Sequence, residues 1–342
     1  MEAIWFCLVA VMLAGYVVLD GFDLGAGVVH LLVARTPDER RAVLRSIGPV
    51  WDGNEVWLLA AGGTLYFAFP ALYASSFSGF YLPLMMVLWL LILRGISIEF
   101  RHHVESPLWQ PFWDVVFGGA SALLIVFYGA ALGNVVRGVP LDADGYFFLP
   151  LWTDFTMGPE PGILDWYTLL VAVAALLALS LHGALWVALK TEGPLEARAG
   201  RFAGRLWWGL AAAVAAITLA SFQVQPNLHN AFAARPWGYL FPLLAAAGLA
   251  GAKLLRGRNA FLASCAFLSG MLAGAAFGIY PYVLPSSGDP ALGLTAANSA
   301  APYYGLSIGL LWFIPGMLLV AGYFVYTYRS FAGKVKMEEE GY

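Results

Sequence analysis

Four acidic residues and one arginine interrupt apolar stretches of this sequence, where charged side chains are rare. Asp20 and Asp23 lie three residues apart, and so do Asp52 and Glu55. Residues three apart share one face of a helix, so each pair points two carboxyl groups in one direction. Arg94 lies in a third apolar stretch. Ionisable groups inside a membrane are costly and mark a candidate functional site, and crowded carboxyl groups are suited to binding and releasing protons.

Counting along each helix places these charges at a common depth. At a rise of about 1.5 Å per residue, Asp20 lies about 24 Å and Asp23 about 28 Å inward from Ile4, in a core about 30 Å thick. By the same rule Arg94 lies about 26 Å inward from Phe77. The other two acids begin a helix that runs outward, so they also lie near the cytoplasmic face. One cationic and four acidic groups are therefore expected together.

Two interpretations of this cluster are open. In the first, its carboxylates pass protons inward from the cytoplasm. In the second, Arg94 forms a buried ion pair with Asp52 or Asp20 that only holds helices together. A pair that only holds helices needs two charges, whereas one arginine here faces four acids. The cluster as a whole therefore favours proton transfer.

The elements that must position these residues are membrane-spanning helices. The 342 residues are 61% hydrophobic and only 11% charged, against about 25% charged in soluble domains. A helix needs about 20 mostly apolar residues to cross a membrane. The sequence predicts an all-α polytopic membrane protein, a single integral membrane domain over 1–342, with nine transmembrane helices at roughly 3–33, 51–70, 76–99, 112–136, 163–189, 204–224, 237–255, 259–282 and 303–328.

Positive charge is distributed very unevenly over the connections between these nine helices. Nine spans put the two termini on opposite sides of the membrane. Sixteen of the 18 lysines and arginines then fall on the side of the C-terminus, which leaves only Arg137 and Arg235 on the other side. Because basic loops stay in the cytoplasm, the N-terminus is predicted outside and the C-terminus in the cytoplasm. A net charge of −3 without a basic stripe excludes a nucleic-acid partner.

Other residues that could hold a cofactor give no pattern for one. Cys7 and Cys265 lie in long apolar runs without metal-ligand spacing. Of the five histidines, only His30 and His182 lie in predicted spans, both near cytoplasmic ends, whereas haem in a membrane bundle takes ligands from facing helices. We therefore expect no metal site, no haem ligand and no catalytic residue in this chain. The spacing of Gly21 and Gly25 predicts close approach of a neighbouring helix.

Several motifs, in order along the chain, resemble subunit II of the cytochrome bd quinol oxidases. The resemblance covers essentially the whole chain, and the block beginning Trp-Asp-Gly-Asn is its most specific part. The motifs are Asp20-Gly-Phe-Asp-Leu-Gly, Trp51-Asp-Gly-Asn-Glu-Val-Trp57, Phe77-Ser-Gly-Phe-Tyr81, Gly133-Asn-Val-Val-Arg-Gly-Val-Pro140 and Pro281-Tyr-Val-Leu-Pro-Ser-Ser287.

This resemblance implies a fold, a set of partners and a set of cofactors. It implies two four-helix bundles plus one peripheral helix, here a first bundle over about 1–137 and a second bundle with the last helix over about 160–330. The partners would be subunit I, a small single-span accessory subunit and membrane lipids, in a bacterial or archaeal plasma membrane. Haems b558, b595 and d would lie in subunit I, and a structural quinone or lipid could bind this subunit.

The resemblance also implies roles for individual residues. Asp20 resembles a proton-path acid at the subunit interface, and Asp52, Arg94 and Glu99 resemble a polar group near the cytoplasmic side. Trp57 resembles an aromatic residue that lines a hydrophobic route for O2. From the residues themselves, Asp23 joins the predicted proton path, with Glu55 as a possible addition.

The predicted function is that of the haem-free second subunit of a bd-type quinol oxidase, which oxidises quinol and reduces O2 to water. This subunit would support subunit I, proton uptake from the cytoplasm and O2 access. The alternatives are a proton-coupled secondary transporter and a purely structural assembly subunit. Transporters of the first kind often carry their sites near the midplane, whereas these acids lie near one face. The acidic stretch at 337–342 is predicted to be a short solvated tail.

Overall fold

The computed structural model describes residues 1–158 and 161–335, and the predicted acidic tail lies outside them. Long helices make up most of the chain, and one short strand pair lies near its end. The elements are α1 (Glu2–Val33), α2 (Pro37–Ile47), α3 (Trp51–Ala68), α4 (Pro70–Gly79), α5 (Tyr81–Phe100), α6 (Trp109–Arg137), α7 (Trp166–Lys190), α8 (Gly193–Val224), α9 (Asn227–Ala234), η1 (Pro236–Tyr239), α10 (Leu240–Leu254), α11 (Gly257–Ile279), β1 (Tyr282–Leu284), η2 (Pro290–Leu292), β2 (Leu294–Thr295) and α12 (Tyr303–Ser330).

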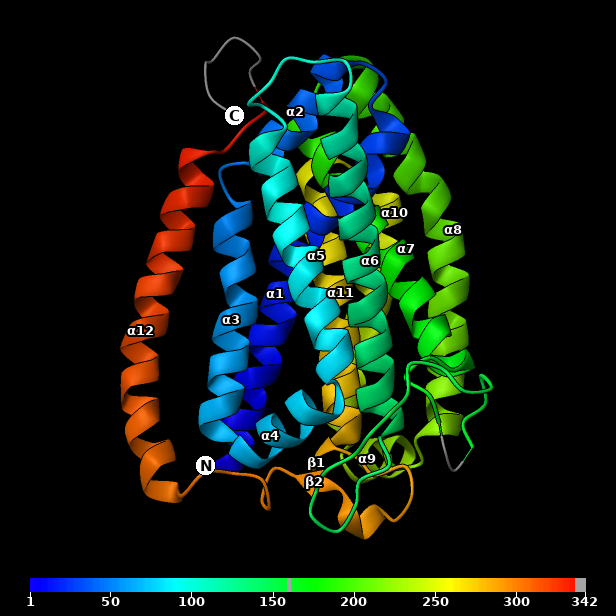
Figure 1. The fold of residues 1–342 in the computed structure, drawn as a ribbon, viewed down its shortest axis with the longest axis vertical. Coiled ribbons are helices and arrows are strands. Elements are labelled where there is room, and N and C mark those ends of the chain that lie inside the picture. Colours follow the sequence, from blue (N-terminus) through cyan, green and yellow to red (C-terminus); the bar gives the residue numbers. More distant parts are fainter. Residues whose placement is uncertain (159–160, 336–342) are drawn as a thin grey trace.

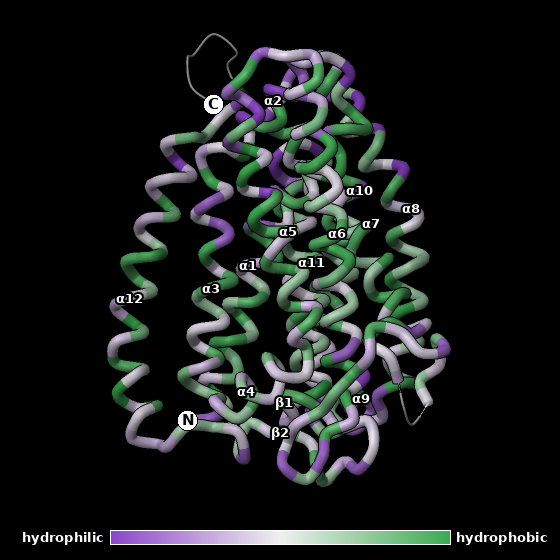
Figure 2. The backbone as a smooth tube through the Cα atoms, viewed as in Figure 1, coloured by the Kyte–Doolittle hydropathy of each residue, from purple (hydrophilic) through white to green (hydrophobic). Residues whose placement is uncertain are grey.

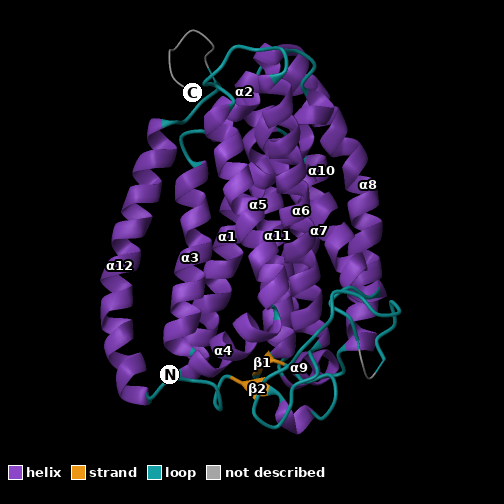
Figure 3. Ribbon diagram, viewed as in Figure 1, coloured by secondary structure: helices purple, strands orange, loops and turns teal. Residues whose placement is uncertain are grey.

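The long helices run side by side, and the connections gather at the two ends of the molecule (Figure 1, Figure 3). α1 begins at the end that carries α4, α9 and the antiparallel pair of β1 and β2. α12 ends at the opposite end, beside α2. Hydrophobic residues cover the middle of the helices and hydrophilic residues concentrate at the ends (Figure 2). This distribution fits a protein whose middle zone faces lipid.

Eight of the described helices are long and apolar enough to cross a membrane: α1, α5, α6, α7, α8, α10 with η1, α11 and α12. They match eight of the nine predicted spans. The ninth, α3, has 18 residues and begins with a polar turn that holds Asp52, Asn54 and Glu55, which lowers its apolar content. α3 nevertheless packs along α1 (Figure 1). The nine-span count stays a prediction.

Two predicted boundaries differ from the structure. The expected outer loop at 71–75 is instead part of α4, which begins at Pro70, because proline fits the first turn of a helix. The third span therefore begins at Tyr81, and the depth of Arg94 counted from Phe77 is too large by about one turn. The cytoplasmic connection before residue 204 is also helical, since α8 begins at Gly193.

α1 and α7 cross with their backbones in contact. A Cβ atom on Gly25 would lie 1.9 Å from the carbonyl oxygen of Leu179, and one on Gly183 would lie 2.1 Å from the carbonyl carbon of Gly25. No side chain larger than hydrogen fits at either position. The predicted close approach of a neighbouring helix to Gly25 is confirmed, and it places α1 in the interior of the molecule.

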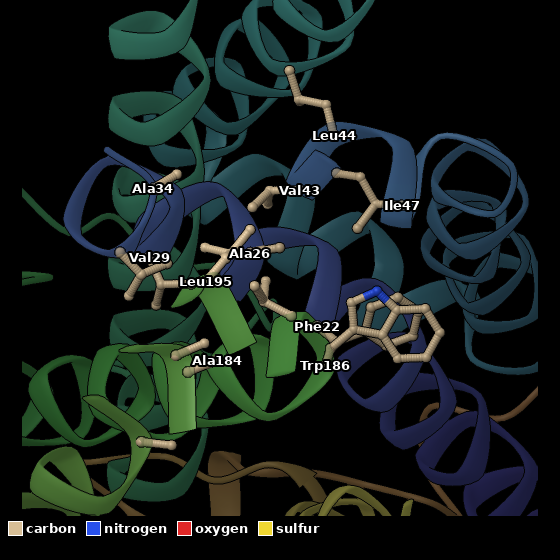
Figure 4. Packing of buried hydrophobic residues seen from close by; sticks show 14 of the residues in the cluster. Phe22, Ala26, Val29, Ala34, Val43, Leu44, Ile47, Ala184, Trp186 and Leu195 are labelled. Atoms are coloured by element: carbon tan, nitrogen blue, oxygen red, sulfur yellow. The ribbon is translucent and has the colours of Figure 1, made fainter. Parts of the chain in front are cut away.

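A cluster of buried apolar side chains closes the end near α2. Phe22 of α1 stacks on Trp186 of α7 with ring centroids 4.0 Å apart, and Val43 and Ile47 of α2 pack into the same cluster (Figure 4). Val43 and Ile47 belong to the apolar face of α2, which is buried against this cluster. This short helix, which lies in a predicted connection, is thus fixed over the C-terminal end of α1.

α1 contacts α3, α6, α7 and α11, so it touches helices from both predicted bundles. α12 lies at the edge of the molecule beside α3 (Figure 1). None of the most apolar 18-residue window of α12 is buried. It is held at one end by the indole of Trp5, which donates to the carbonyl of Leu306 at 3.2 Å. The division into two bundles and a peripheral helix remains a prediction.

Candidate functional site

The centre of the site is an ion pair between α1 and α5. Both terminal nitrogens of Arg94 donate to the carboxylate of Asp20, at 2.6 and 2.5 Å. Both side chains are completely buried. Two parallel bonds of this kind fix geometry as well as charge. The ion pair that the sequence offered as an alternative is therefore present, and its presence leaves the proton-path hypothesis untested.

Asp23, one turn further along α1, is held in a different way. Its Oδ2 accepts a hydrogen bond from the Asn54 amide at 2.7 Å, and the same amide nitrogen donates to the carbonyl of Leu19 at 3.2 Å. The Asn54 oxygen accepts from the hydroxyl of Tyr328 on α12 at 2.8 Å. Asp23 has no cationic partner within salt-bridge distance among the described residues, and its Oδ1 is buried without a hydrogen bond.

The remaining predicted acids are only partly brought to this centre. Glu55 of α3 lies 3.5 Å from Arg94, with about a quarter of its side chain exposed. Asp52, one turn earlier, is exposed on α3. Glu99 lies five residues beyond Arg94 on α5 and is half-buried, and among the described contacts only its backbone carbonyl is bonded, to His103. The structure thus joins Asp20, Arg94 and Glu55.

The local sequence explains this arrangement. α3 begins at Trp51, so its first two turns present Asn54 and Glu55 toward α1 and α5. The guanidinium of Arg94 also lies 5.9 Å from the ring centroid of Trp51. Asn54 completes the site and was quoted in the Trp-Asp-Gly-Asn motif, but charge alone did not single it out. The signal that the sequence offered was an amide side chain next to an acid, Asn54 beside Glu55, at the start of an apolar segment.

Trp57 lies one turn beyond Asn54 on α3. Its ring contacts Phe324 of α12 at a centroid distance of 5.7 Å, and a Cβ on Gly15 of α1 would lie 2.9 Å from it. Its indole nitrogen is buried without a hydrogen bond. Trp57 therefore fills the space between α1, α3 and α12, next to the ion-paired centre.

A second charged cluster, which the sequence analysis missed, lies closer to the α2 end. Asp114 of α6 accepts from Arg101 at 2.5 Å and from Arg40 of α2 at 3.0 Å. Its Oδ1 lies 3.8 Å from Nε2 of His30. Partial burial lowers the pKa of the adjacent His102, and the nearby Arg101 lowers it further. The buried carboxylate of Asp114 on α6 thus lies where α1, α2 and the end of α5 meet.

The two buried histidines are engaged by neighbouring groups. Both ring nitrogens of His182 have partners, the Ser264 hydroxyl at 2.7 Å and the Val18 carbonyl at 3.0 Å. His30 uses Nδ1, which donates to the carbonyl of Gly27 at 2.6 Å. No group of three or more histidine, cysteine, aspartate or glutamate residues in the described part of the chain could hold a metal ion.

A third buried ion pair lies at the opposite end of the molecule. Arg137, at the end of α6, pairs with Asp165 and also donates to the carbonyls of Gly138 and Gly162 and to Asn134. Asp165 in turn caps α7 by accepting from the backbone of Thr168 at 2.8 Å. Sequence reading placed Arg137 in an outer connection, so its pairing was missed.

An apolar cavity of about 810 Å³ opens between α3, α4, α5 and α6. Aromatic side chains from three of these helices line it, among them Tyr66, Tyr73, Phe77 and Phe127. Few polar groups face it, so its walls suit a hydrocarbon chain or an aromatic ring.

Comparison with known proteins gives one consistent result. Residues 1–331 match the family described as cytochrome bd terminal oxidase subunit II. A probable cytochrome oxidase subunit 2 of Haemophilus influenzae is 31% identical over 97% of this chain and 94% of its own length. Cytochrome bd ubiquinol oxidase subunit 2 of Bacillus subtilis is 30% identical over 98% of this chain and 97% of its own. In fold, the chain is similar to a chain of the bd oxidase structure from Geobacillus thermodenitrificans, with a TM-score of 0.71, 19% identity and coverage of 96% and 98%.

Proposed function

The chain belongs to the family of cytochrome bd terminal oxidase subunit II, and we propose which of its residues serve proton and oxygen transfer in that complex. It is a multi-pass membrane subunit of a terminal quinol oxidase. The oxidase works through a partner subunit I, which carries the active site. The transporter alternative is not favoured, because the matches run over essentially the full chain.

The observation that carries the proton proposal is the charge imbalance of the buried site. One guanidinium faces Asp20 and Glu55, and Asp23 lies one turn away with a free oxygen. Several uncompensated negative charges in one buried site would be very costly. The site therefore holds protons on some of its acids, and a group that can hold a proton can pass one on.

We propose that protons reach this site from the cytoplasmic side and leave toward the partner subunit. Asp20, Asp23, Asp52, Arg94 and Glu99 are the proposed members, with Glu55 as an addition. The exposure of Asp52 on α3 and the partial exposure of Glu99 support their place at the start of the path. Arg94 orients Asp20 and balances its charge.

Trp57 is the proposed wall of an O2 route. Small apolar O2 favours a dry path, and Trp57 sits among apolar and aromatic neighbours of α1 and α12. It lies directly beside the ion-paired centre, so that protons and oxygen would travel next to each other without sharing a passage.

We further propose the finer features of the complex. Haems b558, b595 and d would lie in subunit I, in keeping with the hydrogen bonds that occupy both nitrogens of His182 here. The apolar cavity of about 810 Å³ is the proposed place of a structural quinone or lipid. A small single-span subunit would complete the complex.

The proposed arrangement in the membrane has nine spans, including α3, in two bundles with α12 at the periphery. The N-terminus would lie outside and the C-terminus in the cytoplasm of the bacterial cell. Basic residues of α2 and of the connection between α10 and α11 support this orientation, because both follow the cytoplasmic ends of predicted spans.

The deciding experiment is Asp20→Asn in the purified complex with subunit I. Asparagine keeps the shape of aspartate but cannot carry a proton. The proton proposal expects an assembled complex with slowed quinol oxidation and slowed proton uptake, and partial recovery in Asp20→Glu. A role limited to holding helices predicts loss of assembly, since breaking a buried pair costs roughly 3–5 kcal/mol. Full turnover with unchanged proton uptake in an assembled Asp20→Asn complex would refute an obligatory role.

A further inference from the structure

We infer that His30 and Ser121 form a water-bridged proton path along one face of α1, which joins the Asp114 cluster to Asp23. This inference rests on the proposed proton-transfer function of the subunit. It adds a second way for protons to reach the site, from the interior of the α2 end, besides the path through Asp52 and Glu99.

The first support is the spacing of polar positions on α1. Asp20, Asp23, Gly27 and His30 follow each other at intervals of three, four and three residues, which is the spacing of one helix face. All four are buried. The face therefore runs from the ion pair with Arg94 to the α2 end without meeting solvent.

α6 presents a matching face to this one. Asp114, Phe117 and Ser121 are spaced by three and four residues, all are buried, and α6 packs against α1. A Cβ atom on Gly27 would lie 2.3 Å from the Ser121 oxygen, so that hydroxyl lies against the α1 backbone at Gly27. Ser121 thus occupies the level between Asp23 and His30.

Three unsatisfied polar atoms mark the same line. Oδ1 of Asp23, the hydroxyl oxygen of Ser121 and Nε2 of His30 are buried, and none has a hydrogen-bond partner within the described residues. A buried polar atom without a partner is costly, and buried waters are the usual solution. Four residues of helix span about 6 Å and three about 4.5 Å. Two hydrogen bonds of about 2.8 Å through one water reach about 5.6 Å, which covers the shorter gap, whereas the longer gap between Ser121 and Asp23 takes a second water.

The hydrogen bonding of His30 fits it to carry a proton. Its Nδ1 faces the Gly27 carbonyl, which can only accept, so Nδ1 keeps its hydrogen. Nε2 is left as the proton-binding atom, 3.8 Å from Asp114. The other charged groups facing this end are Arg40 and Arg101, both bonded to Asp114. Nε2 therefore faces a carboxylate and keeps an unused lone pair, which a proton-accepting atom needs.

The transfer itself is simple in its chemistry. Nε2 takes a proton from water on the Asp114 side, and the ring becomes an imidazolium. The same nitrogen then returns the proton to the water that leads to Ser121. That hydroxyl donates its own proton onward and receives one in exchange, and Oδ1 of Asp23 accepts the proton at the end. No bond other than those to hydrogen forms or breaks.

The test uses His30→Asn in the complete oxidase complex. The asparagine amide can replace the Nδ1 donor to the Gly27 carbonyl, but it offers nothing that titrates in place of Nε2. We expect an assembled complex with unchanged haem spectrum, several-fold slower proton uptake and turnover, and a larger solvent deuterium isotope effect.

Two serine variants make the test independent of any folding defect at His30. Ser121→Ala removes the relay hydroxyl and should slow proton uptake several-fold. The matched control is Ser46→Ala on α2, where the hydroxyl is equally buried but donates to its own helix at Val43, and it should leave turnover unchanged. Normal proton uptake and isotope effect in assembled Ser121→Ala and His30→Asn complexes would overturn the inference, as would equal slowing by Ser46→Ala.

Failure of this inference can be told apart from failure of the proposed function. If Asp20→Asn slows proton uptake and the His30 and Ser121 variants do not, protons reach Asp20 without this path. If Asp20→Asn leaves proton uptake unchanged while the two others slow it, the path ends at Asp23 and bypasses Asp20. If none of the three has an effect, both ideas fail.

Discussion

Two of the buried arginine–aspartate pairs in this subunit, Arg94 with Asp20 and Arg137 with Asp165, have the same chemistry and opposite surroundings. At the end of the molecule that is outer in the proposed orientation, Arg137 and Asp165 are enclosed by Asn134, two backbone carbonyls and the α7 cap, and neither residue leaves a buried polar atom unpaired. At the inner site, the Nε of Arg94 has no partner, and a further unpaired carboxylate oxygen lies one turn away on Asp23. All buried polar atoms of the first pair have hydrogen-bond partners, whereas the second pair belongs to a larger group in which some buried polar atoms have none among the described residues.

The comparison separates an ion pair that is structural by its surroundings from one whose surroundings support the proposed proton exchange. Charge is balanced one to one in the outer pair, and its arginine and acid are bonded to fixed backbone groups. In the inner site the acids outnumber the guanidinium, and the proposed proton path requires that the additional acids change their protonation while the pair of Asp20 with Arg94 persists. A buried ion pair therefore says little about function until its unpaired neighbours are counted.

The largest expected effect comes from breaking the outer pair with Asp165→Ala. Removing one partner leaves the Arg137 charge buried, which costs roughly 3–5 kcal/mol, and loss of the α7 cap adds about 1 kcal/mol. We expect a strong fall in the yield and thermal stability of the complex. Thermal unfolding of the purified complex measures the loss of stability.

Asp165→Ser separates the two contributions, because serine keeps a capping oxygen and loses the charge. It should recover only the smaller part of the lost stability. Any complex that survives should show normal proton uptake per electron. A stable Asp165→Ala complex with altered proton uptake would reverse the assignment of the two pairs.

A moderate effect on a different quantity is expected from Trp57→Phe and Trp57→Ala beside the inner site. Changing the size of this side chain changes the apolar space between α1, α3 and α12. We expect O2 rebinding after flash photolysis to change in rate, in proportion to the volume removed, with little change in quinol affinity. If stable complexes of both variants rebind O2 at the original rate, Trp57 is a packing residue and the O2 route lies elsewhere.

The smallest effect belongs to an ion pair near the surface, between Arg198 and Glu39. Arg198 of α8 forms an ion pair with Glu39 of α2 at 2.5 Å, and the backbone of Arg35 and Thr36 donates to the same carboxylate. Partial burial raises the pKa of Glu39, but the bonds from Arg198 and the backbone outweigh it and hold the pKa below its ordinary value. An ion pair this near the surface contributes about 0–1 kcal/mol.

The sign of its pH dependence follows from that lowered pKa. A carboxyl group with a depressed pKa in the folded state stabilises the protein above its ordinary pKa, and this contribution is lost as the pH falls through the folded-state value. Glu39→Gln should therefore cost little at neutral pH and nothing in acid, as read from melting temperatures at both pH values. An equal loss at both would show that packing and not charge is involved.

The inner site could be predicted from the sequence better than the outer pair, because its charges lie inside apolar segments, whereas those of the outer pair lie at the ends of such segments. Asp20 and Arg94 interrupt long apolar runs, so each is conspicuous alone, and counting along the helices brought them together. Asn54 carries no charge and was passed over, although it bonds both Asp23 and Tyr328.

The missed clusters have a common physical cause. Arg40, Arg101 and Arg137 flank predicted spans, where basic residues are expected for orientation alone. Their partners, Asp114 and Asp165, lie at the starts of helices, where an acid is also ordinary. Only the fold shows that these flanking charges turn inward. α4 was missed for a similar reason, since a ten-residue helix is too short to stand out beside the longer spans.

α3 also bears on how the chain is inserted into the bilayer during synthesis. Its opening turn is polar, and α3 lies outside the eight described helices that are long and apolar enough to cross a membrane by themselves, so this segment is a poor substrate for the insertion machinery by itself. Tyr328, which bonds Asn54, belongs to α12, a helix translated more than two hundred residues later. One hydrogen bond that fixes the start of α3 therefore forms only after α12 has been made, so the turn that holds the proposed proton-path acids is completed late in synthesis.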